Sequence, residues 1–192
     1  MDSEEFYTKK ELKSKGISTG VKCRISKKVR FYSSQITIGN RCRIDDDVVL
    51  KGKVVISNNV HLARGCTLSG GKLGIYLDDF AALSNFVQIY TVSDNYFSPS
   101  LPAATLTDKE KEQYSSIISR KIQIGKSVLI GTFSVILPGS KLEDFSSVAA
   151  YSVVYTKINK GIFYNPNDKN KNQVFKLRDI KKMEKKLKNF KK

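Results

Sequence analysis

Aliphatic side chains recur every six residues through most of this sequence. A period of six fits neither an α-helix, which repeats every 3.6 residues, nor a free β-strand, which repeats every two. It fits a solenoid in which each hexapeptide forms one flat side of a coil, so that three sides close a coil of about eighteen residues. The aliphatic positions on this grid are Ile38, Ile44, Leu50, Ile56, Leu62, Leu68, Leu77, Leu83, Ile89, Ile124, Ile130, Ile136, Leu142, Val148 and Val154.

A second inward position lies four residues after most grid points and carries small or branched residues. These are Cys42, Val48, Val54, Val60, Cys66, Ala81, Val87, Val128, Ser134, Ser140, Ser146 and Ser152. Two inward side chains per hexapeptide describe one short strand and its corner, so the sequence predicts an all-β fold, a parallel β-helix of hexapeptide repeats. Cys23 falls on the same position one coil earlier. The three cysteines are therefore interpreted as buried side chains and not as disulfide partners or metal ligands.

The grid is interrupted twice. Between Leu68 and Leu77 the step is nine residues, and the extra three coincide with residues 69–72, which include two glycines that tolerate a corner bulge. From Tyr90 to Lys121 the grid lapses and then resumes, which predicts a long excursion loop over 90–121. Loops of this length inside compact domains are usually functional. Within the loop, Thr107 and Glu110 form a capping-box pattern that predicts a helix over 108–114.

The chain of 192 residues suits one domain with two appendages. Residues 1–20 are expected to form a charged lead-in, helical from Glu4 to Lys15 and ended by Gly16. Residues 21–160 are expected to form the β-helix, with its last coil ending near Val154. Residues 161–192 form a basic tail, predicted to be an amphipathic helix because apolar residues recur at three- or four-residue spacing. Those residues are Val174, Leu177, Ile180, Met183, Leu187 and Phe190.

The chain is strongly basic, with 34 Lys and Arg against 18 Asp and Glu and a net charge of +16. Much of the excess lies in the tail after Lys169. It indicates either a solvated face over a docked helix or a surface for a polyanion. Nucleic acid is not expected, because no aromatic-rich sheet, zinc pattern or recognition-helix motif accompanies the charge. Membrane insertion is not expected either, since no apolar run reaches eighteen residues and the first residues are acidic, so the protein is predicted to be cytoplasmic.

The segment from Ile130 to Gly139 reads IGTFSVILPG, which closely resembles the penultimate coil signature of the left-handed β-helix acyltransferases. Residues 149–157 resemble the next coil signature, and Asn165-Pro166 resembles the closing Gly-Asn-Pro of that family, with Tyr164 in place of glycine. The resemblance covers about residues 20–180. It implies a left-handed coil, although parallel crossovers are normally right-handed. It also implies a homotrimer with sites at subunit interfaces, acyl-coenzyme A as co-substrate and no metal. The coenzyme A contacts it implies are Gly131, Thr132, Ala149, Ala150 and Lys157.

The segment from Leu83 to Tyr96 is similar to the sugar-directed members, above all to the N-acyltransferases of the anthrose pathway. These acylate the 4-amino group of a dTDP-linked 4-amino-4,6-dideoxyglucose. The resemblance implies that Asp94 contacts the amine, either orienting it or accepting its proton, and that Ser84 adds a hydrogen bond at the same centre. Asn85 and Tyr90 are assigned with His61 to substrate binding. The alternatives are structural: an Asx turn at the start of the loop for Asp94, and an ordinary outward serine for Ser84.

His61 is the only histidine, and its role separates the hypotheses. One coil plus the three-residue bulge places it beside Ala82, two residues from Ser84, so it could reach the same pocket. An amine acceptor needs little help from a base, whereas a hydroxyl with a pKa far above 7 needs a base to remove its proton.

The leading hypothesis is therefore N-acyl transfer to the nucleotide-linked amino sugar. One alternative is an O-acetyltransferase of a polysaccharide or lipopolysaccharide sugar with His61 as base. Another is a non-catalytic β-helix scaffold that binds polyanions, although a scaffold does not require the long loop.

Overall fold

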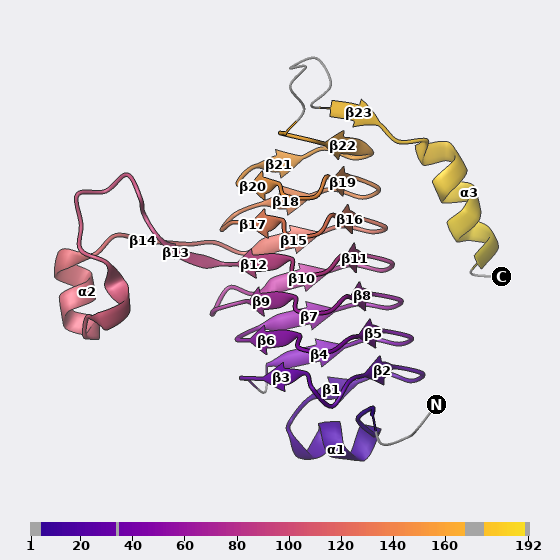
Figure 1. Cartoon of the computed structure of the whole chain (residues 1–192), viewed down its shortest axis with the longest axis horizontal. Coiled ribbons are helices and arrows are strands. Elements are labelled where there is room, and N and C mark those ends of the chain that lie inside the picture. Colours follow the sequence, from indigo (N-terminus) through magenta and orange to yellow (C-terminus); the bar gives the residue numbers. More distant parts are fainter. Residues whose placement is uncertain (1–4, 34, 168–174, 191–192) are drawn as a thin grey trace.

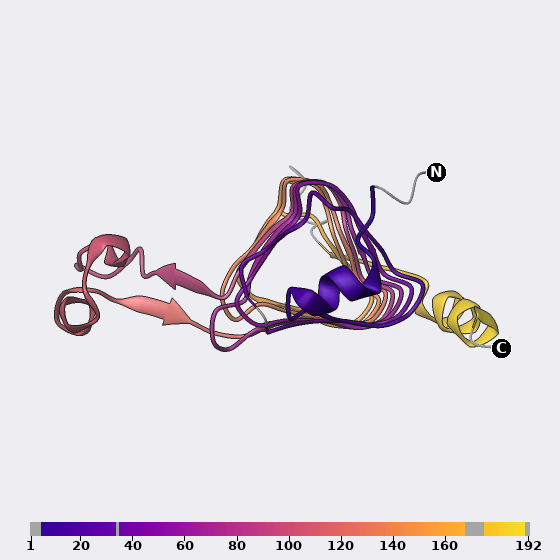
Figure 2. The same cartoon turned by 90° about the horizontal axis from the view of Figure 1, so that it is seen from below.

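The computed structural model describes residues 5–33, 35–167 and 175–190. They form a triangular prism whose three sides are parallel sheets (Figures 1 and 2). Sheet 1 contains β1 (Ser18–Thr19), β4 (Ile36–Ile38), β7 (Val54–Ile56), β10 (Ile75–Leu77), β15 (Ile122–Ile124), β18 (Lys141–Leu142) and β21 (Lys157–Ile158). Sheet 2 contains β2 (Arg24–Ile25), β5 (Arg43–Ile44), β8 (His61–Leu62), β11 (Ala82–Leu83), β16 (Leu129–Ile130), β19 (Ser147–Val148) and β22 (Ile162–Tyr164). Sheet 3 contains β3 (Arg30–Phe31), β6 (Val49–Lys51), β9 (Thr67–Ser69), β12 (Gln88–Tyr90), β17 (Val135–Ile136) and β20 (Val153–Val154).

The chain passes from sheet 1 to sheet 2 to sheet 3 and then begins the next coil, so the prism has corners 1/2, 2/3 and 3/1. Seen from the N-terminal end, it runs counter-clockwise as it recedes from the viewer (Figure 2), which makes the coil left-handed. The predicted fold class, a left-handed parallel β-helix with a long mid-chain loop and a C-terminal helix, is therefore confirmed.

The six-residue grid forms the core. Residues on the grid stack directly above one another in adjacent coils, as in the series Ile44, Leu62, Leu83 and Ile130 of sheet 2. All fifteen aliphatic grid residues are at most 3% exposed, and the second inward positions are equally buried. Because each short strand hydrogen-bonds only to the coils above and below it, this continuous apolar column holds the prism together. The three cysteines are free thiols.

Both interruptions of the grid lie at corner 3/1. The bulge shifts the pairing so that Leu68 lies opposite Ile89, and a Cβ on Gly70 would overlap the carbonyl oxygen of Lys53. The excursion leaves the prism as β13 (Val92–Asp94) and returns as the antiparallel strand β14 (Ile117–Ser119). Between them lie a 3₁₀ turn, η1 (Ala103–Thr105), and α2 (Asp108–Tyr114), which begins with the predicted Thr107–Glu110 capping box. The whole excursion projects away from the corner (Figure 2).

The N-terminal lead-in differs from the expectation. The helix α1 (Lys9–Ser14) is shorter than predicted, because Thr8 and Glu11 form a capping box that sets its start and Phe6 instead bridges to Ser26. Glu4 lies outside the described residues. Leu12 is 2% exposed, so α1 covers the N-terminal end of the core. The first coil begins at Ser18, slightly earlier than predicted.

The C-terminal end also differs. The coils continue past Val154 through β21 and β22, and β23 (Phe175–Leu177) pairs antiparallel with β22 where the sequence predicts helix. The exposed edge of β22 offers unpaired backbone groups, and strand pairing satisfies them where a helix could not. The helix α3 therefore spans only Ile180–Phe190, and Val174 lies outside the described residues. Within the described part of the chain, no helix has the length and apolar character needed to cross a membrane.

Candidate active site

A cavity of about 380 Å³ lies at the sheet 2 side of corner 2/3. It brings together three residues predicted for the acceptor site, His61, Ser84 and Asn85, and one predicted for coenzyme A, Thr132. The register pairs His61 with Ala82, as the bulge arithmetic predicts. The other lining residues are Ala63, Ala82, Leu83 and Leu129, so the cavity combines apolar side chains with the polar groups of His61, Ser84, Asn85 and Thr132.

His61 is held by a carboxylate that the sequence interpretation did not include. Nε2 of His61 lies 2.9 Å from Oδ2 of Asp45, and Nε of Arg43 donates to Oδ1 of Asp45 at 2.7 Å. Burial acts to raise the pKa of Asp45, but the hydrogen bonds from Arg43 and His61 outweigh it and the pKa is lowered. The carboxylate is thus ionised at neutral pH and orients the imidazole. Arg43 lies directly opposite His61 in the adjacent coil. Because the two residues are eighteen positions apart, the repeat could have predicted that they are neighbours.

Two predicted coenzyme A residues, Gly131 and Thr132, lie one coil above Ser84 and Asn85, and Ala149 and Ala150 lie one coil further on. Oγ1 of Thr132 donates to the carbonyl oxygen of Asn85 at 2.7 Å, and the N–H of Tyr151 donates to the carbonyl of Thr132 at 2.9 Å. A Cβ on Gly131 would overlap the backbone of Ala149 and Ala150 in the next coil. The backbone of these coils therefore continues upward from the cavity as a closely packed wall.

An aromatic ladder runs along the same corner. The rings of Phe86, Phe133 and Tyr151 stack with centroid separations of 5.0 and 5.3 Å, and each residue has a positive φ. Phe86 is 40% exposed, Phe133 48% and Tyr151 67%. These rings form an exposed apolar ridge beside the cavity.

The excursion residues lie at another corner. Asp94 ends β13, and its Oδ1 accepts the N–H of Ala103 at 3.2 Å, which ties the loop to its 3₁₀ turn. Tyr90 donates through its hydroxyl to Oε1 of Gln88 at 2.8 Å. Both belong to corner 3/1, whereas Ser84 and His61 belong to corner 2/3. One chain therefore does not bring Asp94 or Tyr90 into the cavity.

Lys157 is also separated from the other predicted coenzyme A residues. It lies on sheet 1, where Nζ pairs with Oε1 of Glu143 at 3.0 Å. Glu143 also pairs with Lys141 at 3.5 Å and accepts the backbone N–H of Lys160 at 3.1 Å. Hydrogen bonding from Lys157, only partly offset by desolvation, lowers the pKa of Glu143.

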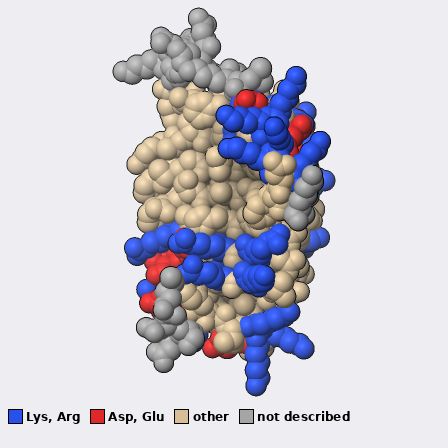
Figure 3. Space-filling model, turned by 90° about the vertical axis from the view of Figure 1, so that its right-hand side faces the viewer, with Lys and Arg blue, Asp and Glu red and all other residues tan. Residues whose placement is uncertain are grey.

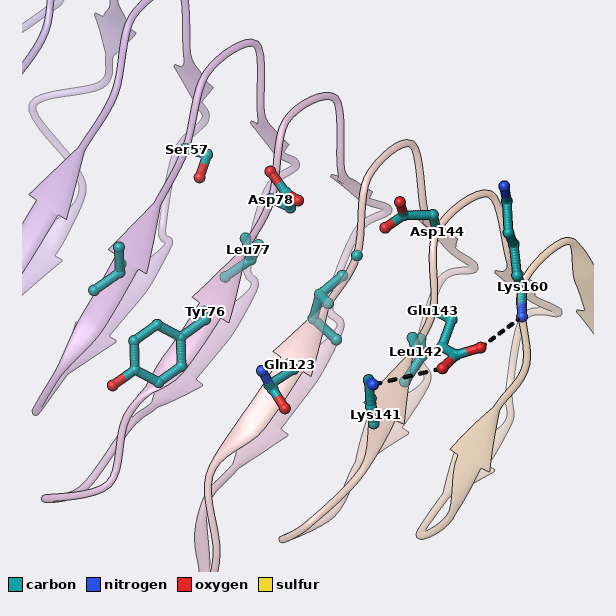
Figure 4. A pocket seen from close by; sticks show the side chains of 13 residues that line it. Ser57, Tyr76, Leu77, Asp78, Gln123, Lys141, Leu142, Glu143, Asp144 and Lys160 are labelled. Carbon is teal, nitrogen blue, oxygen red and sulfur yellow. Dashed lines mark hydrogen bonds and ion pairs between the residues drawn. The ribbon is translucent and has the colours of Figure 1, made fainter. Parts of the chain in front are cut away.

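Glu143 lines a second cavity of about 550 Å³ on the outer face of sheet 1, shown in Figure 4. Tyr76, Gln123 and Lys141 stand on its strands, and Asp78 and Asp144 lie toward corner 1/2. None of the predicted catalytic or substrate-binding residues lines it. We therefore place the candidate site in the cavity at corner 2/3, although the cavity on sheet 1 has the larger volume. Within the described residues, no group of three or more His, Cys, Asp or Glu side chains is arranged to hold a metal ion.

No family model matches the chain. A dTDP-4-amino-4,6-dideoxy-D-glucose acyltransferase from Escherichia coli is 32% identical over 180 residues, which cover 88% of this chain and 91% of that protein. The acetyltransferase domain of PglB from Neisseria gonorrhoeae superposes with a TM-score of 0.52 at 16% identity, over 73% of this chain and 52% of that domain. This second likeness concerns the fold alone.

Crystal structures of AntD, an N-acyltransferase from Bacillus cereus, are much closer. The complex with dTDP and 3-hydroxybutyryl-CoA superposes with a TM-score of 0.86 at 31% identity, covering 97% of each chain. A serine-to-cysteine variant of AntD, in complex with dTDP-4-amino-4,6-dideoxyglucose and coenzyme A, gives the same TM-score, identity and coverage. With sequence similarity to the E. coli enzyme along almost its whole length, the chain belongs to the family of the dTDP-4-amino-4,6-dideoxyglucose acyltransferases.

Proposed function

We propose that this protein transfers an acyl group from acyl-coenzyme A to the 4-amino group of a dTDP-linked 4-amino-4,6-dideoxyglucose. The observation that carries the proposal is the near full-length similarity to an acyltransferase named for that sugar nucleotide. The cavity at corner 2/3 supports it, because Ser84, Asn85 and His61 meet there, one coil below two predicted coenzyme A residues, Gly131 and Thr132.

The reaction needs three things from the site: an unprotonated amine, a donor for the developing oxyanion and a route for one proton. The amine nitrogen attacks the thioester carbonyl and forms the new C–N bond. The tetrahedral oxyanion then collapses and breaks the C–S bond, and the departing thiolate takes up the proton that the amine loses. We assign Ser84 to a hydrogen bond at this centre and Asp94 to the amine, which it orients or deprotonates.

We infer further that the working unit is a homotrimer in which each site lies between two chains. Ser84 and Asp94 lie at different corners of one chain, and the excursion extends away from its own cavity (Figure 2). The excursion of one chain can therefore complete the cavity of another. The exposed aromatic ladder beside the cavity supplies apolar surface for such an interface. With acyl-coenzyme A and the sugar nucleotide as its partners, we propose that the trimer works in the cytoplasm.

The test is release of free thiol, measured with 3-hydroxybutyryl-CoA or acetyl-CoA and either the 4-amino sugar nucleotide or its 4-hydroxy counterpart. We expect release only with the amine. Asp94→Asn and Ser84→Ala should each lower kcat by tenfold or more, on the order of the loss of one transition-state hydrogen bond. Asp108→Asn, a matched exposed carboxylate on the same excursion, should retain the parent rate. Turnover of the hydroxyl sugar alone would refute N-acyl transfer.

The pairing of His61 with Asp45 favours one second candidate function, O-acyl transfer. A carboxylate-oriented histidine in the cavity is the arrangement that an O-acyltransferase would use to deprotonate a hydroxyl. That function predicts that His61→Ala abolishes thiol release while Asp94→Asn does not. For the N-acyltransferase we expect the reverse order of severity, with His61 acting in sugar binding.

A further inference from the structure

The C-terminal helix α3 is docked on corner 1/2 through its apolar face. Ile180 lies against Gly161, where an added Cβ would overlap its side chain, and Phe190 meets Phe80 edge to face at 5.2 Å. Between these ends, Nζ of Lys160 pairs with Oε1 of Glu184 at 2.9 Å. The helix therefore has a defined rotation, and one face is directed away from the prism (Figure 2).

The outward face of α3 is a row of lysines. We call it the lysine ridge; it consists of Lys181, Lys182, Lys185, Lys186 and Lys188, all exposed. It forms the dense blue cluster at the upper right of Figure 3. The one acidic residue within the helix, Glu184, pairs with Lys160, and no ridge lysine forms a salt bridge within the described residues. The guanidinium of Arg41 lies 5.7 Å from the ring of Phe190 and extends the positive surface along the same corner.

The geometry and composition of the ridge select its partner. It stands on a convex corner, so it can meet a broad flat surface but cannot enclose a single strand. The ridge itself contains only lysines, which act as mobile point charges. The neighbouring Arg41 is engaged, because its Nε donates to Oδ1 of Asn59 at 2.8 Å and its guanidinium lies against the ring of Phe190. The ridge therefore does not offer the arginine forks and stacking aromatic faces that recognise nucleic acids. Clusters of four to eight basic residues on an amphipathic helix are typical of binding to anionic lipid headgroups.

We propose that the lysine ridge adsorbs the protein electrostatically to an anionic lipid surface, with α3 remaining docked on the prism. Adsorption leaves the apolar face of the helix on the protein, so the chain does not insert into the bilayer. The ridge lies at corner 1/2 and the candidate active site at corner 2/3. Lipid binding and acyl transfer can therefore be tested independently.

The experiment is co-sedimentation of the full-length protein with vesicles of phosphatidylcholine alone or of an equimolar mixture with phosphatidylglycerol. We expect binding only to the mixed vesicles at about 0.05 M salt, and release at about 0.5 M salt, where charges are strongly screened. Each lysine near such a surface contributes about fivefold to the affinity, so the triple variant Lys181→Gln, Lys185→Gln, Lys188→Gln should bind about a hundredfold more weakly.

The matched control is Lys9→Gln, Lys10→Gln, Lys13→Gln, which removes the same charge from the exposed lysines of α1 at the other end of the prism. It should bind like the parent, and both triple variants should keep the parental rate of thiol release. Equal loss of binding in the two variants would show a net-charge effect and overturn the proposal. So would binding to neutral vesicles, binding that survives high salt, or tighter ridge-dependent binding to a single-stranded oligonucleotide.

Discussion

Among single residues, Cys42 and Cys66 show how an inward position in the coil lowers the reactivity of a thiol. Both thiols are almost completely buried, and Sγ of Cys66 donates to the carbonyl oxygen of Ser84 at 3.1 Å. Burial raises the pKa of each to about 11, above the ordinary thiol value of 9.0. Because only the thiolate is nucleophilic, these side chains are structural and unreactive near neutral pH.

We therefore expect iodoacetamide at about pH 8 to leave Cys42 and Cys66 unlabelled in the folded protein and to modify both after unfolding, as read by mass spectrometry. The partly exposed Cys23 serves as the internal comparison. Since the folded-state pKa values are raised, the stability that the protonated thiols provide is complete below pH 9 and is lost as the pH rises toward 11. Native labelling of Cys66 as fast as that of Cys23 would contradict this assignment.

At the scale of elements, α3 depends on one arginine at its entrance. Nη1 of Arg178 donates to the carbonyl oxygens of Ser127, Phe145 and Ser146 at 3.3, 2.8 and 2.9 Å, and so fastens the start of the helix to corner 1/2. These are charge-assisted bonds to backbone carbonyls of the turns at this corner. A short helix of this kind owes its position to such contacts more than to its intrinsic propensity.

Arg178→Gln should therefore loosen α3 without unfolding the coils. A hydrogen bond to a charged group contributes about 1.5 to 3 kcal/mol, so amide exchange in residues 180–190 should accelerate by about tenfold or more. Hydrogen–deuterium exchange with mass spectrometry measures this directly, with the strands of sheet 2 as internal reference. Lys182→Gln, a change at an exposed lysine of the same helix, should leave the exchange unaltered. Equal exchange in Arg178→Gln and the parent would show that the apolar contacts alone hold the helix.

For the whole molecule, the separation of Ser84 from Asp94 makes assembly part of the chemistry. If each site takes Ser84 from one chain and Asp94 from the neighbouring chain, a chain that lacks Ser84 and a chain that lacks Asp94 can together form one intact site. In a cyclic trimer the interface is heterologous, so each of the three sites draws on a different pair of chains.

Co-expression of Ser84→Ala and Asp94→Asn chains tests this arrangement. Random assembly gives about a quarter of the sites one intact Ser84 and one intact Asp94, and thiol release should return to about a quarter of the parental rate. Mixing separately purified variants that do not exchange subunits is the control and should give no recovery. A failure of the co-expressed, mixed trimers to regain activity would place both residues in one chain.

The sequence alone determined the coil. The period of six can be read from each segment of the sequence by itself, and both of its breaks coincide with the bulge and the excursion of the structure. The helix α2 also spans the predicted residues, Asp108–Tyr114. It also predicted that His61 stacks beside Ala82, since stacking follows from counting residues. The start of α1 at the Thr8 capping box was decided by local hydrogen bonds. The two strands β21 and β22 after Val154 and the strand at Phe175–Leu177 were decided by strand pairing at an open sheet edge.

Only the tertiary structure decided how the functional side chains are arranged. The contacts of His61 with Asp45 and of Asp45 with Arg43 depend on side-chain direction between adjacent coils, which periodicity does not encode. The placement of Lys157 on a different sheet from Gly131, and of Asp94 at a different corner from Ser84, follows from which side of the prism each hexapeptide forms. A repeat specifies which residues point inward, because burial has the same period. It leaves open which outward residues meet, because that depends on the closed shape of the prism.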